Sequence, residues 1–73
     1  MTRAEHIRWC KERAREYLNA GDLQQAIASM MSDLGKHEDT ANLASLPLGL
    51  FELMKPGGPT VQGTRAYIEG FTE

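Results

Sequence analysis

The residues of this sequence best suited to chemistry are a histidine and a cysteine, His6 and Cys10, which lie four positions apart. On a helix this spacing puts both side chains on one face, where they can bind the same metal ion, with His37 and Asp39 as further candidate ligands. The chain has no CxxC or HExxH motif to anchor such a site. We therefore interpret Cys10 as a small hydrophobic side chain and predict neither a metal site nor a cofactor.

Catalysis by the same pair is also disfavoured. A Cys–His dyad needs an orienting third group and an oxyanion hole, and the sequence supplies neither beside His6 and Cys10. Burial on an apolar face should raise the pKa of the thiol, whereas a reactive cysteine needs a lowered one. The glycine-rich stretch 55–60 lacks the Gly-Lys-Ser/Thr ending of a phosphate-binding loop. We predict that the protein is not an enzyme and has no catalytic residues.

Trp9 is the side chain best suited to binding another protein. The helical period places it away from the apolar side of its helix, among Glu5, Arg13 and Glu16. Tryptophan is enriched among the residues that contribute most to protein–protein binding energy. We predict a partner-binding patch made of Trp9, Glu5, Arg13 and Glu16. The alternative is that a later segment folds over Trp9 and buries it.

Three basic residues form a second candidate surface. Arg8, Lys11 and Arg15 have the spacing i, i+3, i+7, which aligns them beside the apolar face of the same helix. Such a stripe can meet an acidic partner or a phosphate backbone, so a small DNA-associated regulator is our alternative hypothesis. The more ordinary interpretation is a surface on which these residues pair with acidic neighbours of their own helix.

Charge disfavours a general nucleic-acid binder. Eight Lys and Arg stand against ten Asp and Glu, for a net charge of −2, and the basic residues are concentrated in the first 20 positions. A helix-turn-helix interpretation of residues 22–46 would put Glu38 and Asp39 at the start of the recognition helix, facing phosphate. We therefore expect a protein partner and no nucleic acid.

These side chains are positioned by a helix that begins at the N-terminus. Thr2 and Glu5 have the spacing of a capping box, and the helix should run to about Asn19. Gly21 can end it and Asp22 can cap the next helix. The predicted apolar face of this first helix consists of Ile7, Cys10, Ala14, Tyr17 and Leu18.

The second predicted helix spans about residues 22–34, with Gly35 placed to end it. Because the connection between the first two helices is short, they should pack as an antiparallel hairpin with their apolar faces in contact. The apolar positions of the second helix follow the helical period throughout: Leu23, Ala26, Ile27, Met30, Met31 and Leu34.

A third, almost entirely apolar segment follows, which Asp39 or Thr40 could cap. Its composition predicts burial on more than one side, and we expect a break or kink at residues 45–47, before or at Pro47. Residues 55–59 should form a turn. Thr60 then caps a last short helix, whose residues expected in the core are Val61, Tyr67, Ile68 and Phe71.

The sequence thus predicts one all-α domain covering residues 1–73, a small bundle of three to four helices built on the N-terminal hairpin. The start lacks the apolar core of a signal peptide, and no apolar run reaches the ~20 residues that span a bilayer. With a single cysteine, Cys10, no internal disulfide is possible. We expect a cytoplasmic protein without membrane contact.

Two resemblances add to this interpretation. The pattern A-x2-Y-x3-GD-x3-A at residues 14–26 resembles the helical hairpin of a tetratricopeptide repeat, where small residues let two helices approach closely. Four stretches, 3–11 (RAEHIRWCK), 20–26 (AGDLQQA), 32–37 (SDLGKH) and 67–71 (YIEGF), resemble a family of small helical proteins of actinobacterial phages and prophages for which no activity is known. The second resemblance implies a phage origin and an all-helical fold, and it supplies no catalytic residues.

Our leading hypothesis is therefore a non-enzymatic phage accessory protein that binds a host or phage protein in the cytoplasm of an infected bacterium. The DNA-associated regulator is the alternative. A third hypothesis is a structural protein that self-associates, as a homodimer, through the apolar third segment.

Overall fold

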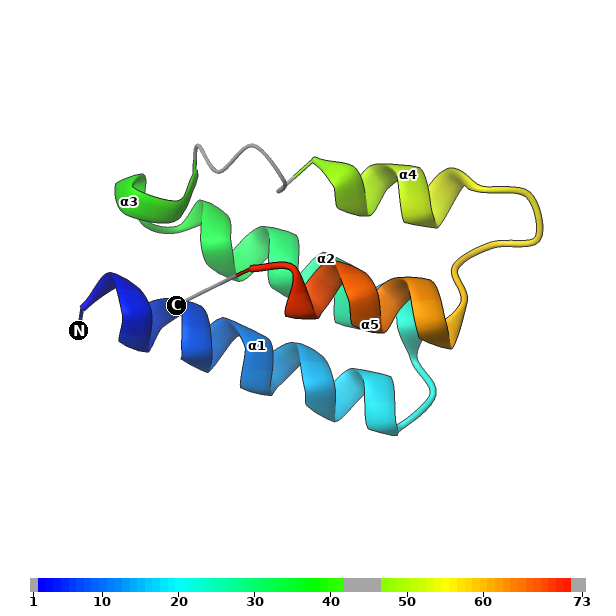
Figure 1. The fold of residues 1–73 in the computed structure, drawn as a ribbon, viewed down its shortest axis with the longest axis horizontal. Coiled ribbons are helices and arrows are strands. Elements are labelled where there is room, and N and C mark those ends of the chain that lie inside the picture. Colours follow the sequence, from blue (N-terminus) through cyan, green and yellow to red (C-terminus); the bar gives the residue numbers. More distant parts are fainter. Residues whose placement is uncertain (1, 42–46, 72–73) are drawn as a thin grey trace.

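The computed structural model describes residues 2–41 and 47–71, which form helices and, within those two ranges, no strand. Figure 1 shows α1 (Arg3–Asn19) and α2 (Leu23–Gly35) side by side and antiparallel, with α5 (Val61–Glu69) packed against both. A single turn, α3 (Glu38–Ala41), follows α2, and α4 (Leu48–Met54) lies on the side of α2 and α5 away from α1. The predicted all-α fold and the hairpin are confirmed.

Both predicted helix starts in the hairpin are confirmed. The Thr2 hydroxyl accepts a hydrogen bond from the Glu5 amide at 3.1 Å, and the Glu5 carboxylate accepts one from the Thr2 amide at 3.2 Å. The Asp22 carboxylate caps α2 by accepting from the Gln25 amide. Gly21, at φ 82°, makes the left-handed turn between α1 and α2 that other residues rarely adopt. These local contacts explain why the hairpin begins and turns where it does.

The core is formed between α1, α2 and α5, where the predicted apolar faces meet. Two expectations about it are wrong: Tyr17 keeps more than a third of its surface exposed, and Val61 about half. Tyr17 lies at the edge of the apolar face of α1, and Val61 is the first residue of α5. The buried hydrophobic residues among those described are Ile7, Cys10, Ala14, Leu18, Ala26, Ile27, Met30, Leu34, Ile68 and Phe71.

The third segment differs most from expectation. α3 begins at Glu38, and the buried Thr40 does not cap it, because its hydroxyl donates instead to the carbonyl of Leu34 near the end of α2. The side chain of Asp39 and all of Ser45 lie outside the described residues. Pro47 immediately precedes α4, where its missing amide costs no helical hydrogen bond.

The predicted burial of this apolar segment is wrong for α4. The only residue that α4 buries is Gly49, while most of its large side chains are on the surface. The predicted turn after it is confirmed, with Gly57 and Gly58 at φ 86° and 83° and the Gly58 amide bonded to the Lys55 carbonyl. Thr60 caps α5 as expected, accepting from the Gly63 amide.

Candidate binding surfaces

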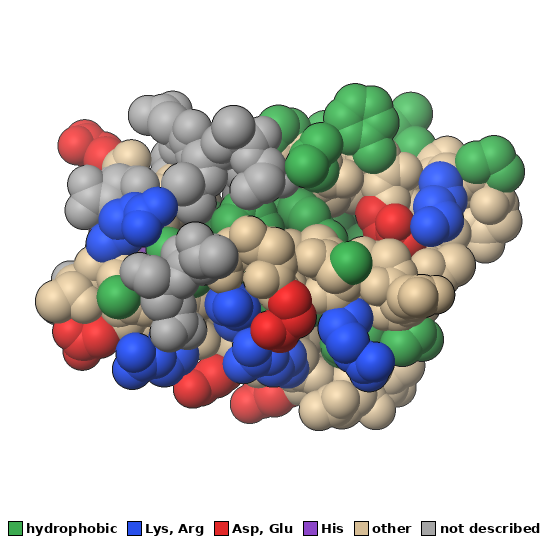
Figure 2. Space-filling view, in the orientation of Figure 1, with side chains coloured by type: hydrophobic (Ala, Val, Ile, Leu, Met, Phe, Trp, Pro, Cys, Tyr) green, Lys and Arg blue, Asp and Glu red, His purple; other side chains and the backbone are tan. Residues whose placement is uncertain are grey.

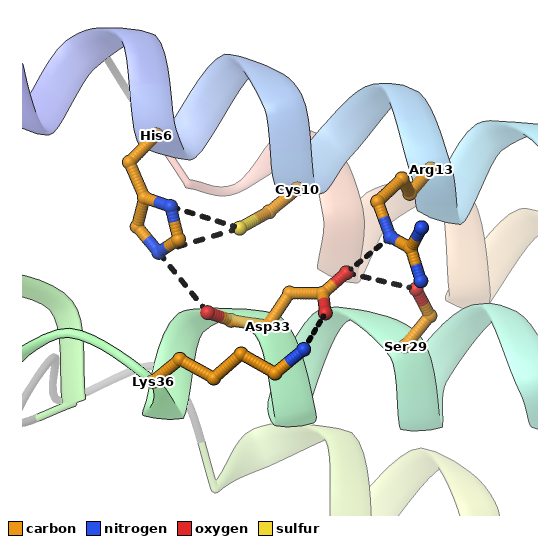
Figure 3. Close-up of polar contacts among 6 residues, drawn as sticks. All are labelled: His6, Cys10, Arg13, Ser29, Asp33 and Lys36. Carbon is orange, nitrogen blue, oxygen red and sulfur yellow. Dashed lines mark hydrogen bonds and ion pairs between the residues drawn. The ribbon is translucent and has the colours of Figure 1, made fainter. Parts of the chain in front are cut away.

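His6 and Cys10 lie together inside the hairpin, as their spacing predicts. The Nε2 of His6 donates to the carbonyl oxygen of Asp33 at 3.0 Å, which leaves Nδ1 unprotonated in the neutral ring. The Cys10 sulfur is 3.7 and 3.9 Å from the two ring nitrogens (Figure 3). Burial, and then the negative charge of Asp33, raise the pKa of Cys10 to about 11, so the thiol stays protonated and unreactive at neutral pH.

The candidate metal ligands whose side chains the structure describes, His6, Cys10 and His37, do not form a metal site, and the side chain of Asp39 lies outside the described residues. The ring of His37 lies against that of His6, with centroids 4.1 Å apart, and His37 is otherwise exposed. Across residues 2–41 and 47–71, no three His, Cys, Asp or Glu side chains are grouped so that they could hold a metal ion. The histidine pair instead joins the end of α2 to the start of α1 by packing.

A buried carboxylate that the sequence analysis did not single out organises the adjacent part of the hairpin. The Asp33 side chain is 2% exposed and accepts from Arg13 Nε at 2.8 Å, Ser29 Oγ at 3.3 Å and Lys36 Nζ at 3.3 Å (Figure 3). Burial by itself would raise the pKa of Asp33, but the hydrogen bonds and charges of Arg13 and Lys36 outweigh it and lower that pKa. Asp33 is therefore an ionised link between α1 and α2.

Trp9 remains on the surface, with 37% of its area exposed. Its indole lies between two residues of α1: the His6 ring is stacked on it at 6.0 Å between centroids, and the Arg13 guanidinium carbon lies 4.9 Å from the ring centroid. Both neighbours of the indole are bonded to Asp33: Arg13 to its carboxylate and His6 to its carbonyl oxygen. The exposed part of Trp9 is thus a rigid aromatic surface.

The other two members of the predicted patch have different surroundings. Glu5 is engaged in the capping box, and its hydrogen bonds from Thr2 lower its pKa. Glu16 is exposed on α1. The structure therefore brings Trp9 and Arg13 into direct contact, with the two carboxylates beyond them along the helix.

Two residues of the basic stripe of Arg8, Lys11 and Arg15 bond to residues near the C-terminus. Lys11 is buried, and its Nζ donates to the Phe71 carbonyl at 2.9 Å. Arg15 forms a two-point ion pair with Glu69, at 2.8 and 3.0 Å. Two of the three cations thus bond to the C-terminal part of the chain, across the α1–α5 contact and not along α1. Arg8 lies on the exposed side of α1.

Most of the large exposed hydrophobic side chains among the described residues lie on α4, and sequence reasoning missed this surface by assuming that the segment is buried. Phe51 and Met54 are 70% and 80% exposed, and Leu48 and Leu50 about half. Figure 2 shows hydrophobic side chains gathered over α4 along the upper edge of the molecule. We refer to Leu48, Leu50, Phe51 and Met54 as the α4 face.

The inward side of α4 carries its smallest and its most polar residue. A Cβ atom at Gly49 would lie within 2.9 Å of side-chain atoms of Tyr67, Ile27 and Met31, so only glycine lets α4 approach this closely. The Glu52 carboxylate accepts from the Thr60 amide at 2.9 Å at the start of α5, and pairs with Lys55 at 3.1 Å. Leu48, Leu50, Phe51 and Met54 consequently point outward, and Leu53 is partly buried.

No helix in the described part of the chain is both long enough and apolar enough to cross a lipid bilayer. The sequence matches no protein-family model, and neither curated proteins nor solved structures show significant similarity to it.

Proposed function

We propose that this chain is a non-enzymatic protein that acts by binding another protein, with the α4 face as its main contact surface. The observation that carries this proposal is the orientation of α4, which leaves Phe51 and Met54 largely exposed while Gly49 is buried. Contiguous exposed apolar residues on a small monomer commonly mark a protein-binding site. Phe51 and Met54 are three positions apart, and Leu50 and Met54 are four apart. Helices that dock into apolar grooves contact them through residues with these spacings.

The Trp9 patch is a second surface for the same function. Trp9 is fixed between His6 and Arg13, and a rigid, partly exposed aromatic group binds with little loss of conformational freedom. Within the described residues α4 packs against α2 and α5 and has no contact with α1, so the two surfaces are separate. A protein bound at Trp9 would leave the α4 face accessible.

The setting we propose is the cytoplasm of an infected bacterium, where the protein serves a phage as an accessory factor. This part of the proposal is supported by the resemblance of residues 3–11, 20–26, 32–37 and 67–71 to helical phage proteins. The DNA-associated alternative has less support, because Lys11 and Arg15 of the basic stripe are bonded to Phe71 and Glu69.

The proposal is tested by capture on the immobilised chain, from an actinobacterial extract supplemented with untagged copies of the same chain. We compare the wild type with Phe51→Ser, Trp9→Ala and, as a matched surface control, Gln24→Ala. At least one protein should bind to the wild type and to Gln24→Ala, and binding should fall by about tenfold or more in Phe51→Ser or Trp9→Ala, the size of effect seen for central interface residues. If no bound protein, including the chain itself, depends on Phe51 or Trp9, the proposed function is wrong.

A further inference from the structure

The α4 face cannot be buried by a rotation of α4 within its own chain. Turning Phe51 inward would remove Gly49 from its contact with Tyr67, Ile27 and Met31, and a larger side chain does not fit there. It would also remove the Glu52 carboxylate from the amide of Thr60, which begins α5. The outward orientation is therefore fixed by two contacts, and no other described segment of the chain covers these apolar side chains.

The α4 face carries no charge. Its four residues are Leu, Leu, Phe and Met, and the nearest charged groups of the same helix and turn, Glu52 and Lys55, neutralise each other in an ion pair at 3.1 Å. Across a two-fold axis the same surface of each copy meets the other, and a residue on the axis meets its own copy, so a charged residue there would meet a like charge. An uncharged helical face is compatible with itself, and a chain with a net charge of only −2 adds little repulsion between copies.

A lipid surface is a poorer match for the same residues. Helices that lie on membranes combine an apolar face with several Lys or Arg residues that contact anionic headgroups. The polar side of α4 carries the acidic Glu52. The basic residue at the end of the helix, Lys55, forms an ion pair with Glu52. The excess of acidic over basic residues in the chain opposes binding to an anionic surface further.

The extent of the face suits a small dimer. The accessible surface of the molecule is 4521 Å², so an interface covering the usual tenth of a small protein would take about 450 Å² from each copy. Four large side chains that are half exposed or more can supply most of such an area. Small chains often gain stability from disulfides or from oligomerisation. This chain has one cysteine and therefore no internal disulfide.

We infer that the α4 face is covered by a second copy of this chain, in a dimer with a two-fold axis near Phe51. This inference rests on the proposed function and names the protein that the α4 face binds. The two copies of α4 run antiparallel, which brings the N-terminal end of each helix beside the C-terminal end of the other and aligns their dipoles favourably. Because such an interface, about 900 Å² in total, is smaller than the roughly 1,200–2,000 Å² of stable complexes, association is weak and reversible.

The inference is tested with the purified chain by sedimentation equilibrium at rising concentration up to about 1 mM, a range that detects weak dimers. The wild type should move from a mass of 8.1 kDa towards twice that value. Phe51→Ser and Met54→Ser should each need about tenfold more protein for the same degree of association. Since both side chains are largely exposed, these variants keep their fold, which circular dichroism confirms. Tyr17→Ser, which removes an exposed aromatic residue far from α4, should associate like the wild type.

A wild type that stays monomeric throughout this range overturns the dimer, as does a Phe51→Ser variant that associates as strongly as the wild type. If the monomeric wild type nevertheless captures a different protein through Phe51, the dimer is wrong and the proposed function stands. If the monomer binds anionic vesicles through Phe51, a membrane surface replaces the second copy and the dimer is again wrong.

Discussion

At the scale of single residues, hydrogen-bond partners decide what each buried polar group contributes. Thr40 and Thr64 are both completely buried. The Thr40 hydroxyl donates to the Leu34 carbonyl and so satisfies an acceptor near the end of α2. The Thr64 hydroxyl has no hydrogen-bond partner in the described structure. The same side chain is therefore favourable at one position and unfavourable at the other.

Replacing each threonine by valine, which has nearly the same shape, should change stability in opposite directions. Thr64→Val removes an unpaired buried hydroxyl and should raise the free energy of unfolding by about 1 kcal/mol. Thr40→Val leaves the Leu34 carbonyl without its donor and should lower it by about 1–2 kcal/mol. Urea unfolding of both variants checks the pair, and a stabilised Thr40→Val or a clearly destabilised Thr64→Val would contradict it.

Asp33 should make stability depend on pH on the acid side. Its pKa is lower in the folded protein than the ordinary value of 3.8, because Arg13 and Lys36 stabilise the carboxylate. The stabilisation is present above pH 3.8 and is lost as pH falls through the lower folded pKa, when the proton is taken up. Asp33→Asn should cost about 1–3 kcal/mol near pH 7 and flatten the acid-side fall in stability.

Unfolding free energies of the wild type and Asp33→Asn, measured from about pH 7 down to about pH 2, test this linkage. The fall should be reduced and not abolished, because Glu5 and Glu52 also have lowered pKa values in the folded chain. Equal acid-side slopes in the two proteins would show that Asp33 does not contribute.

At the scale of elements, the position of α4 depends on one glycine and one carboxylate. Gly49 allows contact with α2 and α5, and Glu52 links α4 to the start of α5. Neither contact uses a large apolar residue, so the α4 face stays exposed on the surface. This explains how a segment rich in leucine can form the surface of the molecule.

Gly49→Ala should destabilise the protein although alanine is the better helix former. A Cβ at this position lies 2.8 Å from the Tyr67 ring and 2.9 Å from Met31 Sδ, so α4 must move away, at a cost of about 1–3 kcal/mol. Gly35→Ala is the matched control, because a Cβ at Gly35 has open space around it. That variant should be neutral or more stable by up to about 1 kcal/mol. Thermal unfolding of both proteins is the measurement, and equal effects would contradict a close α4 contact.

At the scale of the whole molecule, α5 closes the hairpin. Ile68 and Phe71 enter the core between α1 and α2, and the polar rim is joined by Lys11 to the Phe71 carbonyl and by Arg15 to Glu69. Residues at opposite ends of the chain thus stabilise one another. Most hydrophobic residues of α1, α2 and α5 pack inside the molecule, whereas four of α4 remain on its surface.

If copies associate through the α4 face, stability must depend on protein concentration. Only folded copies associate, and association stabilises the folded state, so the Tm of the wild type should rise with protein concentration. The Tm of Phe51→Ser should rise only at concentrations about tenfold higher, because its dimer is weaker. Calorimetry at concentrations spanning about two orders of magnitude makes this comparison. A Tm that responds equally in both proteins would point to association elsewhere.

Features that depend on residues close together in the chain could be predicted from the sequence. The Thr2 and Asp22 caps, the left-handed Gly21 turn, the two periodic helices and their antiparallel pairing all follow from residues within a few positions of one another. The position of Cys10 on an apolar helix face also predicted its raised pKa, to which the distant Asp33 adds. The exposure of Trp9 also agrees with its place on the polar side of its helix.

Features that join residues distant in the chain follow from tertiary packing and could not be predicted. Lys11 and Arg15 bond to residues more than 50 positions away, and Asp33 receives Arg13 from the other helix of the hairpin. The outward turn of α4 is the clearest case. A run of apolar residues indicates that a segment avoids water, but which side faces the core depends on where Gly49 and Glu52 find partners on α2 and α5. The hydrophobic effect is non-directional, so the orientation of an apolar helix is set by the specific packing contacts that it makes.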